Sequence, residues 1–189
     1  KKPELLVTPQ SVEHVAALLE AGADAFVIGE QKFGLRLAGE FTVAQVEEAT
    51  KLIHAAGKKV YVAVNVLFHN DRLDALDDYL KEMQRIGVDA LIFGDPAVIV
   101  AVRELGVTIP LHWNPETTAT NWFQVNYWGE RGSKRGVLAR ELSVDEVLEI
   151  KENTKHEIEV QVHGMTCMFQ SKRSLLGNYF LYRDEAMEI

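Results

Sequence analysis

The stretch that decides the fold is EIEVQVHG, residues 157–164, which is predicted to form a strand near the end of the chain. Side chains alternate between the two faces of a strand. One face here carries an isoleucine and two valines, and the other carries glutamate, glutamine and histidine. In an open doubly wound sheet, helices cover both faces, and both faces would be apolar. A (β/α)8 TIM-type barrel fits the alternation better, because the top of its lumen can be polar and functional.

Short apolar runs and amphipathic stretches alternate along the rest of the chain. Six further runs rich in valine and isoleucine lie at residues 5–7, 25–28, 60–67, 90–93, 111–113 and 137–139. Apolar residues at helical spacing separate the runs, most clearly at Val12, Val15, Ala16 and Leu19 and at Leu73, Leu76, Leu80 and Met83. The predicted N-caps of the helices are Ser11, Thr42, Asp71 and Ser143. Strands that alternate with helices predict a parallel sheet with right-handed crossovers.

The length of the chain is short for a complete barrel. It has 189 residues, whereas a barrel of this type usually needs about 250. We therefore expect a single, incomplete α/β barrel domain over residues 1–189, truncated after about seven strands. A barrel without its eighth strand exposes two sheet edges, which predicts pairing of two copies into a homodimer.

Charge and cysteine content limit the classes of function. The formal net charge of −8 argues against nucleic-acid binding through bulk positive charge, so RNA contact would need a local basic patch or a partner. Cys167 is the single cysteine, which excludes an internal disulfide and cannot hold a metal cluster alone. No apolar run is long enough to span a membrane and no signal-peptide pattern opens the chain. We expect a cytoplasmic protein with no membrane partner.

Polar residues follow the predicted strands where a barrel carries its active site, at the carboxyl ends of the strands. They are Glu30, Asn65, Asp95, His112, Asn114, Arg140, Glu141 and His163. Any one of them could simply meet solvent at a strand end, but the set as a whole favours a site. We predict no metal, because His112 and His163 lack a clear carboxylate partner and hydrogen-bonded structural histidines are commoner.

Other chemical motifs are absent or ambiguous. The chain has neither an HExxH zinc motif nor a GxSxG elbow. Cys167 lies four residues after His163, so a nucleophile pair is conceivable, although a lone buried thiol is commoner. For the aromatic residues around the fifth apolar run, at residues 111–113, we favour packing in the core over stacking on nucleic-acid bases. This aromatic cluster consists of Trp113, Trp122, Phe123, Tyr127 and Trp128. Two basic patches could receive phosphate or form solvated faces: Lys134, Arg135 and Arg140, and Lys172, Arg173 and Arg183.

The tail, residues 165–189, completes a motif that resembles the signature of the peptidase U32 family. The motif reads EVQVHGMTC at residues 159–167 and continues with SKRSLLGNYF at residues 171–180. RGVLARELS at 135–143, VYVAVN at 60–65 and the segment 29–41 also fit the family, so the resemblance covers nearly the whole chain. It implies a barrel-type fold. The family name implies a collagenase-like protease, whereas other members act in oxygen-independent hydroxylation of tRNA uridine, ribosomal RNA cytidine or quinone precursors.

The chain departs from those hydroxylating members, whose four cysteines hold an iron–sulfur cluster. Cys167 matches the first of these cysteines, but Ser174 stands where the second is expected, and a hydroxyl is a poor substitute for thiolate at iron. We therefore expect no cofactor in this chain. It resembles most the smaller, cysteine-poor branch of the family. That resemblance implies wobble-uridine 5-hydroxylation of tRNA, with prephenate as co-substrate and with tRNA and a cysteine-bearing U32 homologue as partners.

The leading hypothesis is a U32 protein of tRNA modification. The alternatives are a peptidase and a non-catalytic scaffold that binds the cysteine-bearing homologue. For catalysis we predict Glu141 and His163, the latter in hydrogen bonding or proton transfer. The residues predicted to bind substrate, with the arginines holding an anion, are Arg36, Asn65, Asn114, Arg140, Lys172 and Arg173.

Overall fold

Seven parallel strands form one sheet in the computed structural model, which describes residues 2–164 and 175–183. The strands pair in the order of the sequence, β1 to β7. Their bounds are β1 Leu6–Val7, β2 Ala25–Ile28, β3 Lys59–Val64, β4 Ala90–Phe93, β5 Leu111–Trp113, β6 Ser133–Val137 and β7 Glu157–Glu159. The predicted parallel sheet of seven strands is confirmed.

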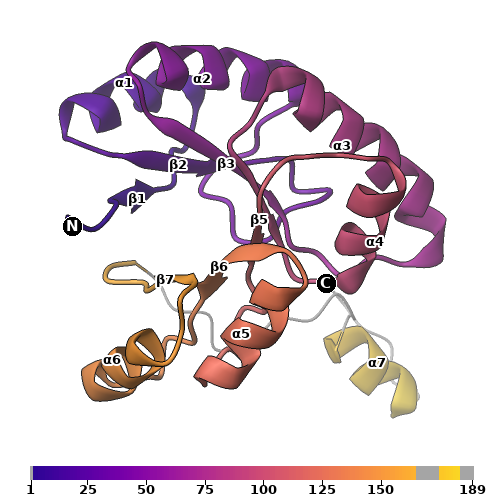
Figure 1. The fold of residues 1–189 in the computed structure, drawn as a ribbon. Coiled ribbons are helices and arrows are strands. Elements are labelled where there is room, and N and C mark those ends of the chain that lie inside the picture. The colour runs from indigo at the N-terminus through magenta and orange to yellow at the C-terminus, as the bar shows by residue number, and fades with distance from the viewer. Residues whose placement is uncertain (1, 165–174, 184–189) are drawn as a thin grey trace.

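Helices connect the strands and cover the outer face of the sheet (Figure 1). Their bounds are α1 Val12–Glu20, α2 Val43–Ala55, the 3-10 helix η1 Asn70–Arg72, α3 Leu73–Ile86, α4 Pro96–Glu104, α5 Trp122–Glu130, α6 Val144–Glu152 and α7 Leu175–Tyr182. None of the helices in the described ranges is long and apolar enough to cross a membrane.

Successive residues of the central strands point to two different apolar clusters. Val60 and Val62 of β3 belong to the large core between sheet and helices, whereas Tyr61 between them packs with Ala90 and Ile92 of β4 on the opposite face. That opposite face is the inside of a curved sheet. The predicted alternation of faces is therefore present in the middle of the sheet as well as in β7.

A contact across the lumen shows how far the sheet curls. Arg135 of β6 lies 2.9 Å from a carboxylate oxygen of Glu4, just before β1. In a flat sheet β1 and β6 would lie about 24 Å apart, because neighbouring strands are spaced by about 4.8 Å. The sheet therefore curves back on itself as an incomplete TIM-type barrel, as predicted, with β1 and β7 at its two edges (Figure 1).

Some predicted element boundaries are wrong. The sixth strand was expected at residues 137–139 but covers Ser133–Val137, because its polar residues are buried by partners distant in the sequence. The third strand ends at Val64 instead of residue 67, and the last ends at Glu159 instead of continuing to residue 163. The polar side chains after both strands thus belong to loops.

Two of the four predicted helix caps are confirmed in full. Thr42 and Ser143 each accept a hydrogen bond from the third residue of their helix, and each forms a reciprocal capping box. Ser11 precedes α1 but its side chain makes no bond to the helix backbone. Asp71 is not a cap of α3, because it lies within η1 and Arg72 takes the capping position.

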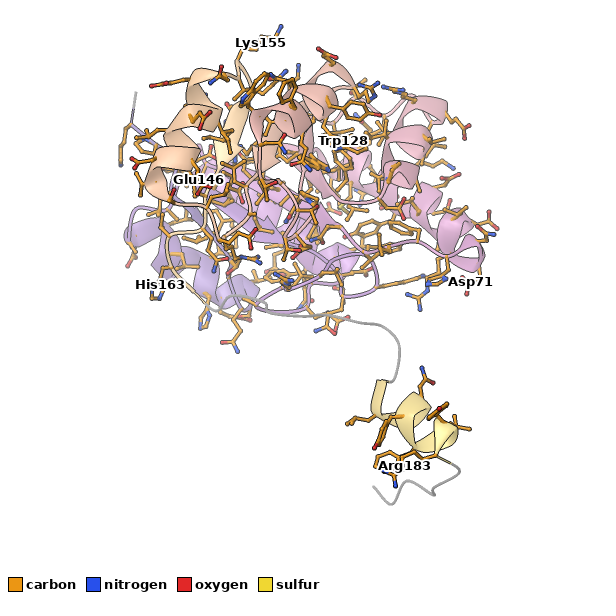
Figure 2. All side chains as sticks on the ribbon, turned by 90° about the horizontal axis from the view of Figure 1, so that it is seen from below. Asp71, Trp128, Glu146, Lys155, His163 and Arg183 are labelled. Carbon is orange, nitrogen blue, oxygen red and sulfur yellow. The ribbon has the colours of Figure 1, made fainter. Side chains whose placement is uncertain are left out.

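The two ends of the barrel are visible in Figure 2. Lys155, just before β7, lies at one end, while His163, which follows β7, and Asp71, which follows β3, lie at the other. The end marked by His163 and Asp71 is the one where the strands finish, and we call it the rim. Helix α7 stands apart from the body on the side of the rim (Figure 2).

Candidate functional site at the rim

The centre of the rim cluster is Glu116, in the loop after β5. Its Oε1 accepts a hydrogen bond of 2.7 Å from Nδ2 of Asn65, which directly follows β3. Its Oε2 lies 2.8 Å from Nη1 of Arg36 and 3.9 Å from Nη2 of Arg140. Three loops thus converge on one carboxylate, which the sequence analysis did not identify.

Two asparagine side chains build the loops that hold this cluster. Asn114, directly after β5, accepts a bond of 2.9 Å from the backbone N–H of Glu116 and so closes an Asx turn. Asn65 accepts a bond of 2.8 Å from the backbone N–H of Leu35, next to Arg36. Asn114 thus holds the backbone of its own loop, and Asn65 holds the backbone of the loop after β2, so together they position the two partners of the central ion pair.

The backbone is strained at both ends of that ion pair. Arg36 has φ 57° and Glu116 has φ 69°, and no other non-glycine residue of the described chain has a positive φ. Such conformations are uncommon for residues with a Cβ and cluster at ligand clamps and active sites. The coincidence of both outliers in one ion pair makes the rim cluster the strongest candidate for a functional site in the described chain.

The cluster is largely shielded from water but unevenly paired. The side chains of Arg36, Arg140 and Glu116 are 25%, 21% and 17% exposed. Arg140 donates through Nε to Oε1 of Gln161, yet its buried Nη1 has no hydrogen-bond partner. Two guanidinium groups share one carboxylate, and buried donors without partners are costly. Chemically, this arrangement is suited to binding an anion.

The remaining predicted site residues lie elsewhere. His163 is exposed at the surface of the rim end (Figure 2), where its backbone carbonyl accepts from Nε2 of Gln161. Glu141 is exposed beside Arg140 in the chain. Lys172 and Arg173, like Cys167, lie outside the described residues. The roles of these residues stay predictions, whereas Arg36, Asn65, Asn114 and Arg140 are brought together.

A second polar cluster fills the lumen toward the opposite end of the barrel. Its centre is Arg135, only 8% exposed, which lies 2.9 Å from Glu4, 2.7 Å from Glu157 and 3.4 Å from Glu159. Arg135 was considered as part of a phosphate-binding basic patch. That alternative is wrong for this residue, because three carboxylates already occupy its guanidinium. Residues at this end of a barrel serve stability.

His112 belongs to the lumen and not to the rim. It is 4% exposed and meets the ring of Tyr61 edge-on, with 4.7 Å between ring centroids. Burial, with Arg135 nearby, lowers the pKa of His112 to about 3. Among the residues that the structure describes, no group of three potential ligands is placed to hold a metal ion. The geometry favours a neutral, structural His112.

The aromatic cluster divides into a packed part and an exposed part. Trp113 is buried and stacks on Trp128, as core packing predicts. Phe123 and Tyr127 on the outer side of α5 are 67% and 50% exposed, and a shallow hollow of about 580 Å³ lies along this helix. The hollow lies in the outer helix layer, away from the convergent polar groups of the rim.

Comparison with known proteins places the chain in a family. The model of peptidase family U32 matches residues 10–187. The chain is 58% identical over 189 residues to tRNA hydroxylation protein P2 of Bacillus subtilis, covering all of this chain and 61% of that protein. It is 38% identical to tRNA hydroxylation protein P1 of the same organism, covering 97% of this chain and 44% of that protein. The chain thus spans about three fifths or less of the length of these relatives.

A solved structure of a U32 peptidase has a similar fold. Its TM-score is 0.73 over 87% of this chain and 70% of that one, at 16% sequence identity. A 2,3-dimethylmalate lyase structure has a TM-score of 0.61 at 13% identity, which shows a shared fold alone. The family model covers most of the sequence, and the chain belongs to peptidase family U32.

Proposed function

We propose that this protein takes part in tRNA hydroxylation, at C5 of wobble uridine. The observation that carries the proposal is the 58% identity, over the whole chain, to tRNA hydroxylation protein P2. The lower identity of 38% to protein P1 favours the P2 branch. The polar cluster at the rim supports an active role, because enzymes with barrel folds carry their sites at this end.

A deletion strain tests the proposal. Nucleoside mass spectrometry of total tRNA should show a loss of 5-hydroxyuridine and its derivatives, restored by the wild-type gene. The variants Arg36→Gln and Arg140→Gln should fail to restore them, since each removes a cation of the rim. The matched control is Arg85→Gln, because Arg85 pairs with Glu47 and Glu82 on the outer helices. Unchanged 5-hydroxyuridine derivatives in the deletion strain would refute the proposal.

The family name makes peptidase activity the second candidate. It predicts cleavage of a fluorescent gelatin substrate by the purified full-length protein, and loss of cleavage on changing one rim residue. A peptidase needs a paired nucleophile and base or a metal-bound water. Ser133, the serine closest in sequence to the lumen arginine, instead donates to the backbone carbonyls of Leu111 and Arg135. Ser133 is therefore not paired with a catalytic base, and the preference for the tRNA role rests on the 58% identity to tRNA hydroxylation protein P2.

The partners of the protein belong to the same proposal. A cysteine-bearing U32 homologue would supply the iron–sulfur cluster that one cysteine cannot hold. Co-expression with such a homologue should give a complex that co-purifies, and two separate elution peaks would contradict it. The alternative contact is self-association through β1 and β7, because each of these strands pairs on one side only in the described sheet. Light scattering on the purified protein measures such self-association.

A further inference from the structure

The carboxylate of Glu116 occupies a place built for an anion. It receives a hydrogen bond from Asn65, an ion-pair contact from Arg36 at 2.8 Å and a longer one from Arg140 at 3.9 Å. A guanidinium pairs best with a carboxylate through two parallel hydrogen bonds. The donors around Glu116 are those that would receive the carboxylate of a bound molecule.

The pairing of Glu116 with Arg36 and Arg140 is incomplete. Its buried Oε2 accepts no well-directed hydrogen bond, and the buried Nη1 of Arg140 donates none. The Asx turn with Asn114 fixes the backbone of Glu116, and from this position its carboxylate lies 2.8 Å from Arg36 but 3.9 Å from Arg140. The carboxylate of a free molecule is not fixed in this way and could pair closely with both guanidinium groups.

The backbone conformation also points to an arrangement that can change. Arg36 and Glu116 both have positive φ, and strain of this kind is kept only where the surroundings enforce it. The Asx turn with Asn114 holds the backbone of Glu116, so its side chain can leave the arginines while the loop keeps its shape.

We infer that Glu116 is an internal occupant of a small-molecule carboxylate site, and that a carboxylate ligand binds Arg36 and Arg140 by displacing it. The inference concerns the site of the proposed function and rests on that function for its biological role. A small molecule is favoured over an RNA phosphate, because the side chains of the two arginines are only 25% and 21% exposed. Glu116 thereby keeps the site closed until its ligand is present.

Binding measurements on the purified full-length protein test the inference without any tRNA assay. Malonate is the probe, titrated by isothermal calorimetry, with inorganic phosphate and unmodified tRNA as parallel titrations. Glu116→Gln should bind malonate about tenfold or more tightly than the wild type, because a competing charge is removed. Arg140→Gln should bind it about tenfold or more weakly. The matched control is Glu47→Gln, whose carboxylate pairs with Lys51 and Arg85 outside the rim.

Each outcome decides the inference. Equal malonate affinity of wild type, Glu116→Gln and Glu47→Gln would overturn it, as would a gain seen only for phosphate or only for tRNA. If Glu116→Gln fails to fold by circular dichroism, Glu116→Asp replaces it, since the shorter side chain competes less and should also strengthen binding. Stronger malonate binding together with unchanged tRNA in the deletion strain would support this inference and refute the proposed function alone.

Discussion

Replacing Arg135 by methionine should destabilise the barrel strongly. The change removes the cation that lies among Glu4, Glu157 and Glu159 and keeps most of the side-chain volume. Removing one partner of a buried ion pair costs about 3–5 kcal/mol. Glu157 is 61% exposed and can be hydrated, so the lower end of that range, about 3 kcal/mol, applies here.

For a chain of this length, that loss corresponds to a decrease in Tm of roughly 6–12 °C. Urea and thermal unfolding followed by circular dichroism measure it at pH 7. The deficit should shrink as the pH is lowered, because Glu159 then takes up a proton and loses its unpaired charge. Burial already raises the pKa of Glu159 in the wild-type protein, and removing the charge of Arg135, which lowers that pKa, raises it further.

Arg85→Met provides the matched control. Arg85 also pairs with two carboxylates, Glu47 and Glu82, but it is 52% exposed on the helix layer. Exposed ion pairs contribute about 0–1 kcal/mol each. If Arg135→Met costs no more than Arg85→Met, or if its deficit does not change with pH, the lumen cluster does not hold the two ends of the sheet together as described.

Three further predictions concern single residues. Burial lowers the pKa of His112 in the folded protein to about 3, below its unfolded value. Its contribution to stability is therefore present at neutral pH and is lost as the pH falls from about 6.5 toward 3. The unfolding free energy of the variant His112→Phe should vary less over this pH range. Thr42→Ala should cost about 1 kcal/mol by loss of the capping box, measured by urea unfolding, whereas Ser11→Ala, which lacks a cap bond, should cost almost nothing. Asn114→Ala should release the turn that presents Glu116, which two-dimensional NMR would detect as a shift of the Glu116 amide; an unchanged amide would argue against the turn.

The apolar pattern of the sequence was sufficient to predict most strands of the sheet. The runs at residues 25–28 and 90–93 coincide with β2 and β4, because these strands are buried on both faces and read as continuous apolar segments. The run at residues 111–113 coincides with β5, although its central residue is the buried His112. β6 was misplaced because Ser133 and Arg135 are polar. Their burial depends on Glu4 and Glu157, which come from other parts of the chain.

The rim was foreseen in part. Polar residues just after strands were expected to converge, and Asn65, Asn114 and Arg140 do so with Arg36. Glu116 was missed because it follows β5 at a distance of three residues and resembles any exposed loop glutamate. A signal was available in Asn-Pro-Glu at residues 114–116, since asparagine before proline favours a turn that could aim the next side chain.

Sequence alone was enough to predict a parallel, incomplete barrel and the end of it that carries polar groups, because hydrophobic periodicity is a local property of each segment. The alternation in residues 157–164 already distinguished the two faces of the final strand, although the structure ends that strand at Glu159. Only the folded chain shows that Glu116 joins residues 51 and 80 positions earlier and that Arg135 closes the lumen. Such pairings depend on loop paths and on the curl of the sheet, which no local pattern encodes.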